Sequence, residues 1–101
     1  MAQASFEAVG AGAYRVSGPL DFTTVPVIWK ASLPLLRQGG GEPSIDLAGV
    51  SQVDSAGLAL LLEWVRLAGE ARQRLRILGM PDKLLALARM SETEGFLAPA
   101  T

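Results

Sequence analysis

The residues best suited to chemistry lie in one stretch, residues 45–58, which reads IDLAGVSQVDSAGL. Asp46 and Asp54 flank its loop, and Ser55 directly follows the second carboxylate. Two carboxylates of this kind could hold a cation or act as an acid–base pair. A serine at the start of a helix could instead cap the helix, or carry a phosphate at the positive end of its dipole.

The composition argues against most kinds of enzyme. The chain has no cysteine and no histidine, which removes thiol nucleophiles, thiolate metal sites and the commonest general base. Asp46 alternates with Ile45 and Leu47 and should point away from their face, so neither Asp46 nor Asp54 has an evident companion ligand or base. The glycine run at residues 39–41 lacks the lysine and serine of a P-loop. We therefore expect a protein that is not an enzyme and that binds no cofactor or metal.

Length and charge limit the possible architectures and partners. The 101 residues suit a single domain, residues 1–101, and half of them are apolar. The formal net charge of -1 disfavours binding to nucleic acid through phosphate neutralisation. Four arginines close together in sequence are expected to form a solvated helix end and strand edge: Arg66, Arg72, Arg74 and Arg76. No signal peptide or membrane-spanning run of ~20 apolar residues is evident, so we expect a cytoplasmic protein.

Apolar periodicity and turn residues predict strands that alternate with helices. Strands are expected at residues 6–9, 14–17, 44–48 and 75–78, with a glycine loop at residues 10–12 between the first two. Gly18-Pro19 should end the second strand, and residues 49–54 should form a loop. Helices are expected from Thr23 or Thr24 to Gly39, from Ser55 to Gln73, and from Pro81 to about Ser91.

This order predicts an α/β fold with a small mixed sheet of about four strands and three main helices. Pro34 should kink or loosen the last turn of the first helix. Phe96 and Leu97 could add one short apolar contact near the C-terminus.

The long predicted helix carries more apolar residues than one sheet can cover. One stripe consists of Leu58, Leu61, Leu62 and Val65, and a second, roughly 100° around the helix, consists of Leu60, Trp64 and Leu67. The second stripe should meet either a neighbouring helix or a partner protein, and the pattern leaves both alternatives open. Ala56 and Gly57 are small, and we expect them to let another surface approach the first turn closely.

These motifs resemble those of the STAS domain, the fold of bacterial anti-sigma-factor antagonists and of the C-terminal domains of sulfate transporters. The resemblance runs from about Phe6 to about Ser91. Its most specific part is Ile45-Asp46-Leu47, followed by residues 53–58 and Leu60-Leu61-Leu62. Gly18-Pro19-Leu20-Asp21 resembles the short turn after the family's second strand. The family's phosphorylatable hydroxyl residue would fall on Ser55.

Within this family the chain is similar to the small STAS subunits of bacterial phospholipid ABC transporters, through its short length, Trp29, residues 54–63 and residues 79–84. That resemblance implies a non-catalytic cytoplasmic subunit, which binds the transporter's ATPase subunit, and through it the permease, and so helps to maintain outer-membrane lipid asymmetry. The implied partner-binding residues are Asp54, Ser55, Ala56, Gly57, Leu60, Trp64 and Trp29.

The alternative is an anti-sigma-factor antagonist in a partner switch, with Ser55 as the phosphorylated residue. Such antagonists usually have two small hydroxyl residues in a row before the glycine, whereas here the second is Ala56.

Overall fold

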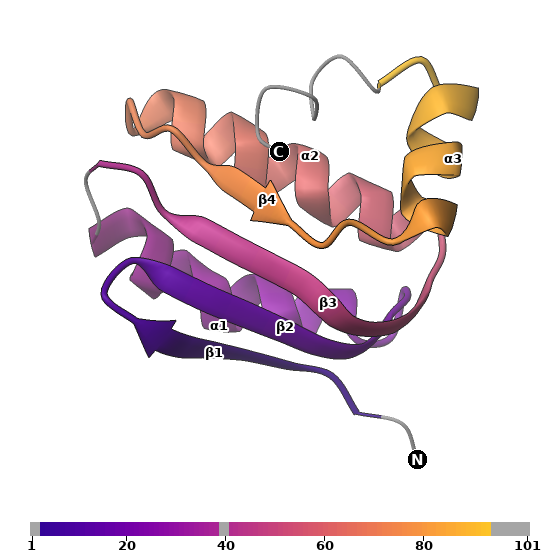
Figure 1. The fold of residues 1–101 in the computed structure, drawn as a ribbon, viewed down its shortest axis with the longest axis horizontal. Helices are drawn as coiled ribbons and strands as arrows, with labels where there is room; N and C mark the ends of the chain where they lie inside the picture. The colour runs from indigo at the N-terminus through magenta and orange to yellow at the C-terminus, as the bar shows by residue number, and fades with distance from the viewer. Residues whose placement is uncertain (1–2, 39–40, 94–101) are drawn as a thin grey trace.

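The computed structural model describes residues 3–38 and 41–93, which form a four-stranded sheet and three helices (Figure 1). The elements are β1 (Ser5–Gly10), β2 (Ala13–Leu20), α1 (Val25–Gln38), β3 (Ser44–Val53), α2 (Ser55–Glu70), β4 (Arg76–Leu78) and α3 (Asp82–Met90). The strand order is β1-β2-β3-β4; β1 is antiparallel to β2, whereas β2, β3 and β4 are mutually parallel. The predicted α/β fold with a mixed sheet is therefore confirmed.

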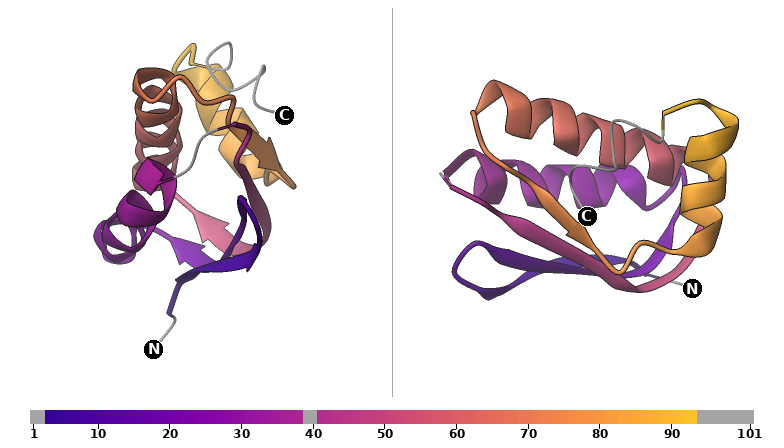
Figure 2. Two further views of the ribbon diagram at one scale, coloured as in Figure 1. Left: turned by 90° about the vertical axis from the view of Figure 1, so that its left-hand side faces the viewer. Right: turned by 45° about the horizontal axis from the view of Figure 1, so that its top comes forward.

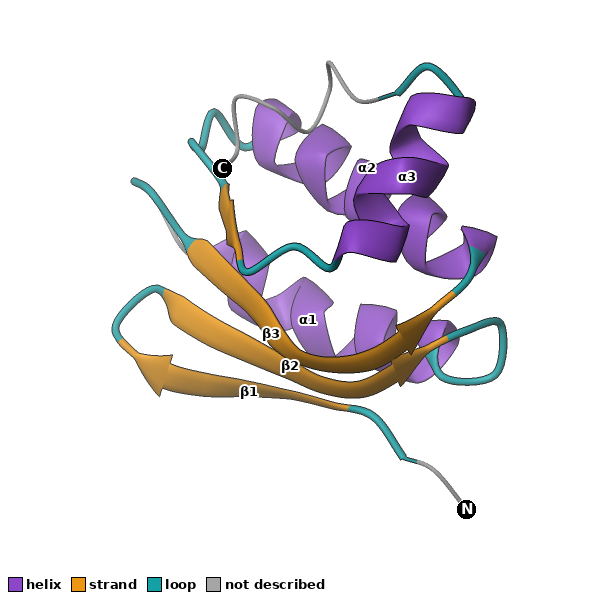
Figure 3. Cartoon of the chain, turned by 45° about the vertical axis from the view of Figure 1, so that its right-hand side comes forward, coloured by secondary structure: helices purple, strands orange, loops and turns teal. Residues whose placement is uncertain are grey.

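Helices α1 and α2 lie on the same face of the sheet (Figure 2). β3 pairs on one side of β2, and β4 then pairs on the same side of β3. Because the two crossover connections have the same hand, their helices, α1 and α2, lie on the same face of the sheet. Helix α3 follows the last strand and packs against α2 (Figure 3). No described element covers the opposite face, where the exposed side chains of Ser5, Glu7 and Arg15 lie because they alternate with inward-facing residues of β1 and β2.

The core lies between the covered face of the sheet and the helices. Its fully buried large side chains are Val16, Leu20, Ile28, Ile45, Leu47, Leu61, Trp64, Ile77 and Leu84. Both apolar stripes of α2 contribute to this core, because the helix contacts β3, α1 and α3. Leu60, Trp64 and Leu67 are only 2%, 0% and 9% exposed. Of the two alternatives for the second stripe, the structure supports packing within the chain.

A buried hydrogen-bond chain joins α2 to α1. The indole Nε1 of Trp64 donates to the hydroxyl of Ser32 at 2.9 Å, and that hydroxyl donates to the carbonyl of Trp29 at 2.9 Å. The Phe6 ring packs beside the indole with a centroid separation of 5.8 Å. Each polar group in this chain of hydrogen bonds therefore has a partner, which offsets the cost of burying it.

Two strands are longer than the sequence predicts. Gly18-Pro19 does not end β2, and residues 49–53 extend β3 instead of forming a loop. The two extensions pair with each other, and register shifts between Arg15 and Ser17 and between Gly18 and Pro19 absorb the glycine and proline. Local turn propensity is therefore overridden by pairing with a neighbouring strand.

The helix boundaries also differ in detail. Helix α1 continues past Pro34 to Gln38, and α2 ends at Glu70 rather than at Gln73. Arg72 adopts a left-handed φ of 56°, and the amide of Gln73 donates to the carbonyl of Ala68, which closes α2 in the geometry of a Schellman motif. The predicted contact of Phe96 and Leu97 lies outside the described residues.

Candidate functional site

Helix α2 begins at Ser55, directly after β3 ends. The carboxylate of Asp54 accepts a hydrogen bond from the amide of Ala56 at 2.8 Å, so Asp54 is the N-cap of the helix. The amide of Asp54 donates to the carbonyl of Leu20 at 3.1 Å, which ties the start of α2 to the end of β2. Ser55 is exposed on this fixed framework. The sequence left open whether Asp54 or Ser55 caps the helix, and the structure assigns the cap to Asp54.

Gly57 has a different role from the one expected. It is buried, and a Cβ there would lie 3.2 Å from both the Cβ and the carbonyl oxygen of Leu20. The small size of Gly57 thus allows α2 to approach the end of β2 within the chain, rather than admitting a partner. Ala56 is half-buried beside it. Of the small residues in this turn, only Ser55 is exposed.

We expect Asp54→Ala and Ser55→Ala to separate these roles. Loss of the cap should destabilise Asp54→Ala by about 1 kcal/mol, within the range of roughly 0.5–2 kcal/mol for such caps. Ser55→Ala removes an exposed hydroxyl and should change the free energy of unfolding by less than about 0.5 kcal/mol. Urea denaturation of both variants measures the difference. A larger loss in Ser55→Ala than in Asp54→Ala would contradict the capping assignment.

The loop between β2 and α1, residues 21–24, lies at the same end of the sheet. Oδ1 of Asp21 accepts hydrogen bonds from the amide and the hydroxyl of Thr23, at 2.9 and 2.6 Å, and from the amide of Thr24 at 3.1 Å. The Thr24 hydroxyl accepts from the amide of Asp21 and donates to the carbonyl of Pro19 at 2.8 Å. These bonds fix a loop whose tip is Phe22, with 77% of the residue exposed.

Sequence reasoning missed Phe22 and Asp21 as members of this site. A signal was present in the pattern Asp-Phe-Thr-Thr at residues 21–24. An aspartate side chain readily accepts a hydrogen bond from the backbone amide two residues later, which closes a turn. The exposure of an aromatic ring at the tip of such a turn depends on the tertiary structure.

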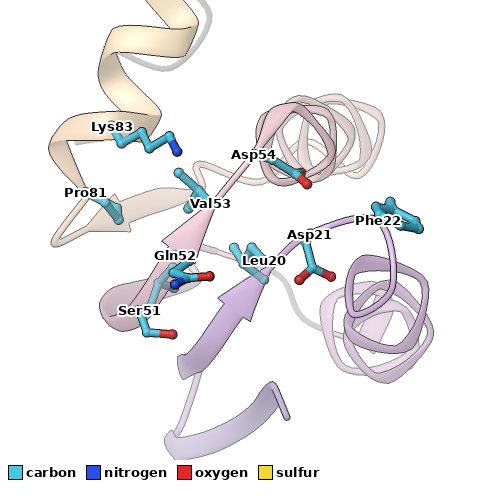
Figure 4. Close-up of a pocket in the computed structure, with 10 residues that line it drawn as sticks. Leu20, Asp21, Phe22, Ser51, Gln52, Val53, Asp54, Pro81 and Lys83 are labelled. Atoms are coloured by element: carbon cyan, nitrogen blue, oxygen red, sulfur yellow. The ribbon is translucent and has the colours of Figure 1, made fainter. Parts of the chain in front are cut away.

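An open cavity of about 580 Å³ lies where β2 and β3 end and where α2 and α3 begin (Figure 4). It is lined by residues 20–22 and 50–54, together with Pro81 and Lys83. Its charged groups are the carboxylates of Asp21 and Asp54 and the single ammonium of Lys83, so acidic groups outnumber basic ones two to one. Phe22 projects at the rim of this acidic cavity.

Acid should weaken the loop through Asp21. The hydrogen bonds from the Thr23 side chain and from the amides of Thr23 and Thr24 lower the pKa of the Asp21 carboxyl below its ordinary 3.8. Because the folded pKa is depressed, this contribution to stability is present above pH 3.8 and is lost as the pH falls through the folded pKa. Thermal unfolding followed from pH 7 to pH 2 should therefore show a smaller acid destabilisation in Asp21→Ala than in the unchanged chain. Identical pH profiles for Asp21→Ala and the unchanged chain would contradict this role of Asp21.

A second hollow, an apolar groove of about 350 Å³, lies between α1 and α2. Its lining residues are Val25, Pro26, Trp29, Ala59, Leu60 and Glu63. The expected site residues Trp29 and Leu60 therefore meet here, although Leu60 is almost completely covered. Ser55, Ala59 and Glu63 are all exposed and four residues apart, so they form one strip along α2 beside the groove.

Trp64 does not belong to this surface. Its side chain is fully buried and bonded to Ser32, so it offers no contact to a partner in this conformation. The expectation that Trp64 contributes directly to an interface is corrected accordingly: its apolar surface is already covered by the chain's own core.

The two carboxylates that the sequence offered as a pair, Asp46 and Asp54, have separate roles in the fold. Asp46 accepts a hydrogen bond from the amide of Ala48 at 2.8 Å on β3, away from the cap at Asp54. Within residues 3–38 and 41–93, no group of three or more histidine, cysteine, aspartate or glutamate residues could hold a metal ion.

Arg66 pairs with Glu63 and Glu70 on the exposed side of α2, at 2.8 and 2.6 Å. None of the helices in the described part of the chain combines the length and apolar character needed to cross a membrane.

Comparison with known proteins identifies the family. A family profile described as "Mlab, STAS domain" matches residues 7–98. The chain belongs to the STAS domain family. The fold agrees: the solved structure of the anti-sigma factor antagonist SpoIIAA in its unphosphorylated form aligns with a TM-score of 0.67 and 20% sequence identity, covering 86% of this chain and 82% of SpoIIAA.

Two kinds of STAS protein match at the sequence level. The intermembrane phospholipid transport system binding protein MlaB of Escherichia coli is 35% identical over 75 residues, which is 74% of each chain. The anti-sigma-B factor antagonist of Staphylococcus epidermidis is 31% identical over 70 residues, or 69% of this chain. The aligned region spans 65% of the length of that antagonist. Both kinds share the domain, and their identities to this chain are similar.

Proposed function

We propose that this STAS domain is a non-catalytic subunit of an Mla-type phospholipid ABC transporter. It binds the transporter's ATPase subunit, and through it the permease, at the cytoplasmic side of the inner membrane, and stabilises or activates that ATPase. The observation that carries this proposal is the match to MlaB, which is 35% identical over 74% of both chains. The family profile, described as Mlab-type, supports it.

The geometry around Ser55 supports a docking role for this end of the molecule. Ser55 lies exposed on a capped helix start, next to a strip of exposed α2 residues and an apolar groove. Because Asp54 already satisfies the cap, the hydroxyl of Ser55 is not required for the fold and is available for contact. The proposed interface therefore consists of Ser55, Ala59 and the groove that contains Trp29.

Co-expression tests this proposal. The chain, carrying an affinity tag, is produced with the ATPase subunit of a phospholipid transporter from the same organism, and co-purification is measured. We expect a stable complex and a higher ATP turnover than the ATPase shows alone, whereas the isolated chain should hydrolyse no ATP. Failure of the two proteins to co-purify would contradict the proposal.

The second candidate is an anti-sigma-factor antagonist regulated by phosphorylation of Ser55. It is favoured by the 31% identity to the staphylococcal antagonist and by the exposure of Ser55 at the first residue of α2. Mass spectrometry of protein from native cells discriminates between the two. A phosphate on Ser55, together with capture of a small serine kinase from the lysate, would favour this candidate.

A further inference from the structure

We infer that Phe22 is an aromatic anchor, which inserts into an apolar pocket on the ATPase subunit that carries lysine or arginine at its edge. This inference rests on the proposed function, because it names a contact for the same partner. Three observations carry it: the exposure of the ring, the rigidity of its loop, and the charge around it.

Phe22 is the most exposed aromatic residue among those that the structure describes. With 77% of the residue exposed, the ring contributes little to the core. Val27, 62% exposed, lies on the first turns of α1 in the same part of the chain. Aromatic residues are over-represented among the residues that dominate binding energy, so an exposed phenyl ring is a candidate contact for a partner.

The loop that carries Phe22 is held in a fixed shape. Asp21 and Thr24, the residues on either side of Phe22-Thr23, are joined by hydrogen bonds in both directions, and Thr24 also bonds to Pro19. A ring presented by a rigid loop loses little conformational freedom on binding, so more of its burial contributes to affinity.

The charges around the ring define the partner's chemistry. Phe22 borders the cavity that contains the carboxylates of Asp21 and Asp54 and the ammonium of Lys83. Figure 4 shows Asp21 just past the end of β2 and Asp54 at the start of α2, whereas Lys83 comes from α3. The Asp21 carboxyl, whose pKa the hydrogen bonds from Thr23 and Thr24 lower below its ordinary 3.8, is ionised at neutral pH. Complementarity therefore favours a partner surface with cationic side chains beside its apolar pocket.

The test compares Phe22→Ala with Met90→Ala, in complexes with the purified ATPase subunit. Met90 is a matched control because it is 81% exposed but lies at the end of α3. We expect both variants to melt at the temperature of the unchanged chain. Phe22→Ala should raise the dissociation constant at least about tenfold, whereas Met90→Ala should change it less than about twofold. Phe22→Leu should recover part of the loss, and binding of the unchanged chain should weaken as salt is raised.

The outcomes separate the two proposals. If the unchanged chain binds the ATPase and Phe22→Ala binds within about twofold of it, the anchor is disproved and the proposed function stands. An equal loss in Met90→Ala would also disprove the anchor, because the effect would not be specific to this loop. If the unchanged chain does not bind the ATPase at all, both proposals fall.

Discussion

Trp64→Ala should destabilise the folded domain strongly. The indole is completely buried, contacts the Phe6 ring and donates a hydrogen bond to Ser32. Truncation of a core tryptophan to alanine leaves a cavity and typically costs about 3–5 kcal/mol, against a total stability of about 5–15 kcal/mol for a domain of this kind. It also leaves the Ser32 hydroxyl without its donor. We therefore expect the midpoint of thermal unfolding to fall by more than about 12 °C.

Two controls make this result interpretable. Trp64→Phe keeps most of the ring but removes the Nε1–H, so it should cost much less than Trp64→Ala. Met90→Ala, at an exposed position, should leave the midpoint almost unchanged. If Trp64→Ala instead melted like the unchanged chain and lost only its binding to a partner, the second apolar stripe of α2 would belong to an interface after all.

Ser55→Arg and Ser55→Glu should abolish the proposed complex while the domain stays folded. Ser55 is exposed at the first residue of α2, so a longer side chain there can extend into solvent in the free chain. At the centre of an interface the same side chain would be buried without a partner. A charge left unpaired in this way costs about 3–5 kcal/mol, which corresponds to a loss of at least about a hundredfold in affinity.

The two charges should differ in their effect on the free chain. Glutamate at the start of a helix is favourable to the helix dipole and arginine is unfavourable, each by about 0.3–1 kcal/mol. Both variants should nevertheless lose the complex, and Ser55→Arg should lose at least as much affinity as Ser55→Glu, because the proposed partner surface carries cationic side chains near Asp54. Ala86→Arg, on the exposed side of α3, is the matched control and should bind normally. Normal binding by either Ser55 variant would place the interface elsewhere.

The sequence allowed the order of the elements to be predicted because their signals are local. Strands rich in β-branched and apolar residues, the proline near the start of α1 and the acidic cap before α2 all act within a few residues. The lengths of β2 and β3 could not be predicted in this way. Gly18 and Pro19 are turn residues by their own preferences, and only pairing with residues 49–53 makes them part of a strand.

The candidate site was predicted in part. Asp54 and Ser55 were recognised because a polar residue before an apolar helical pattern marks a helix start. The burial of Trp64 and Gly57 depends on contacts with Ser32 and Leu20, which are distant in sequence, so the pattern alone could not distinguish a core position from a surface one. Phe22 was missed for the same reason, because its exposure follows from how the loop is held.

The uncovered face of the sheet makes this protein easy to label for experiments in solution. Ser5 is exposed on that face, opposite the side on which α1 and α2 pack, and the chain has no cysteine of its own. A single Ser5→Cys substitution is almost isosteric and would therefore accept one thiol-reactive fluorophore at one defined position. Such a reporter could follow complex formation by anisotropy while leaving both the core and the loop of Phe22 untouched.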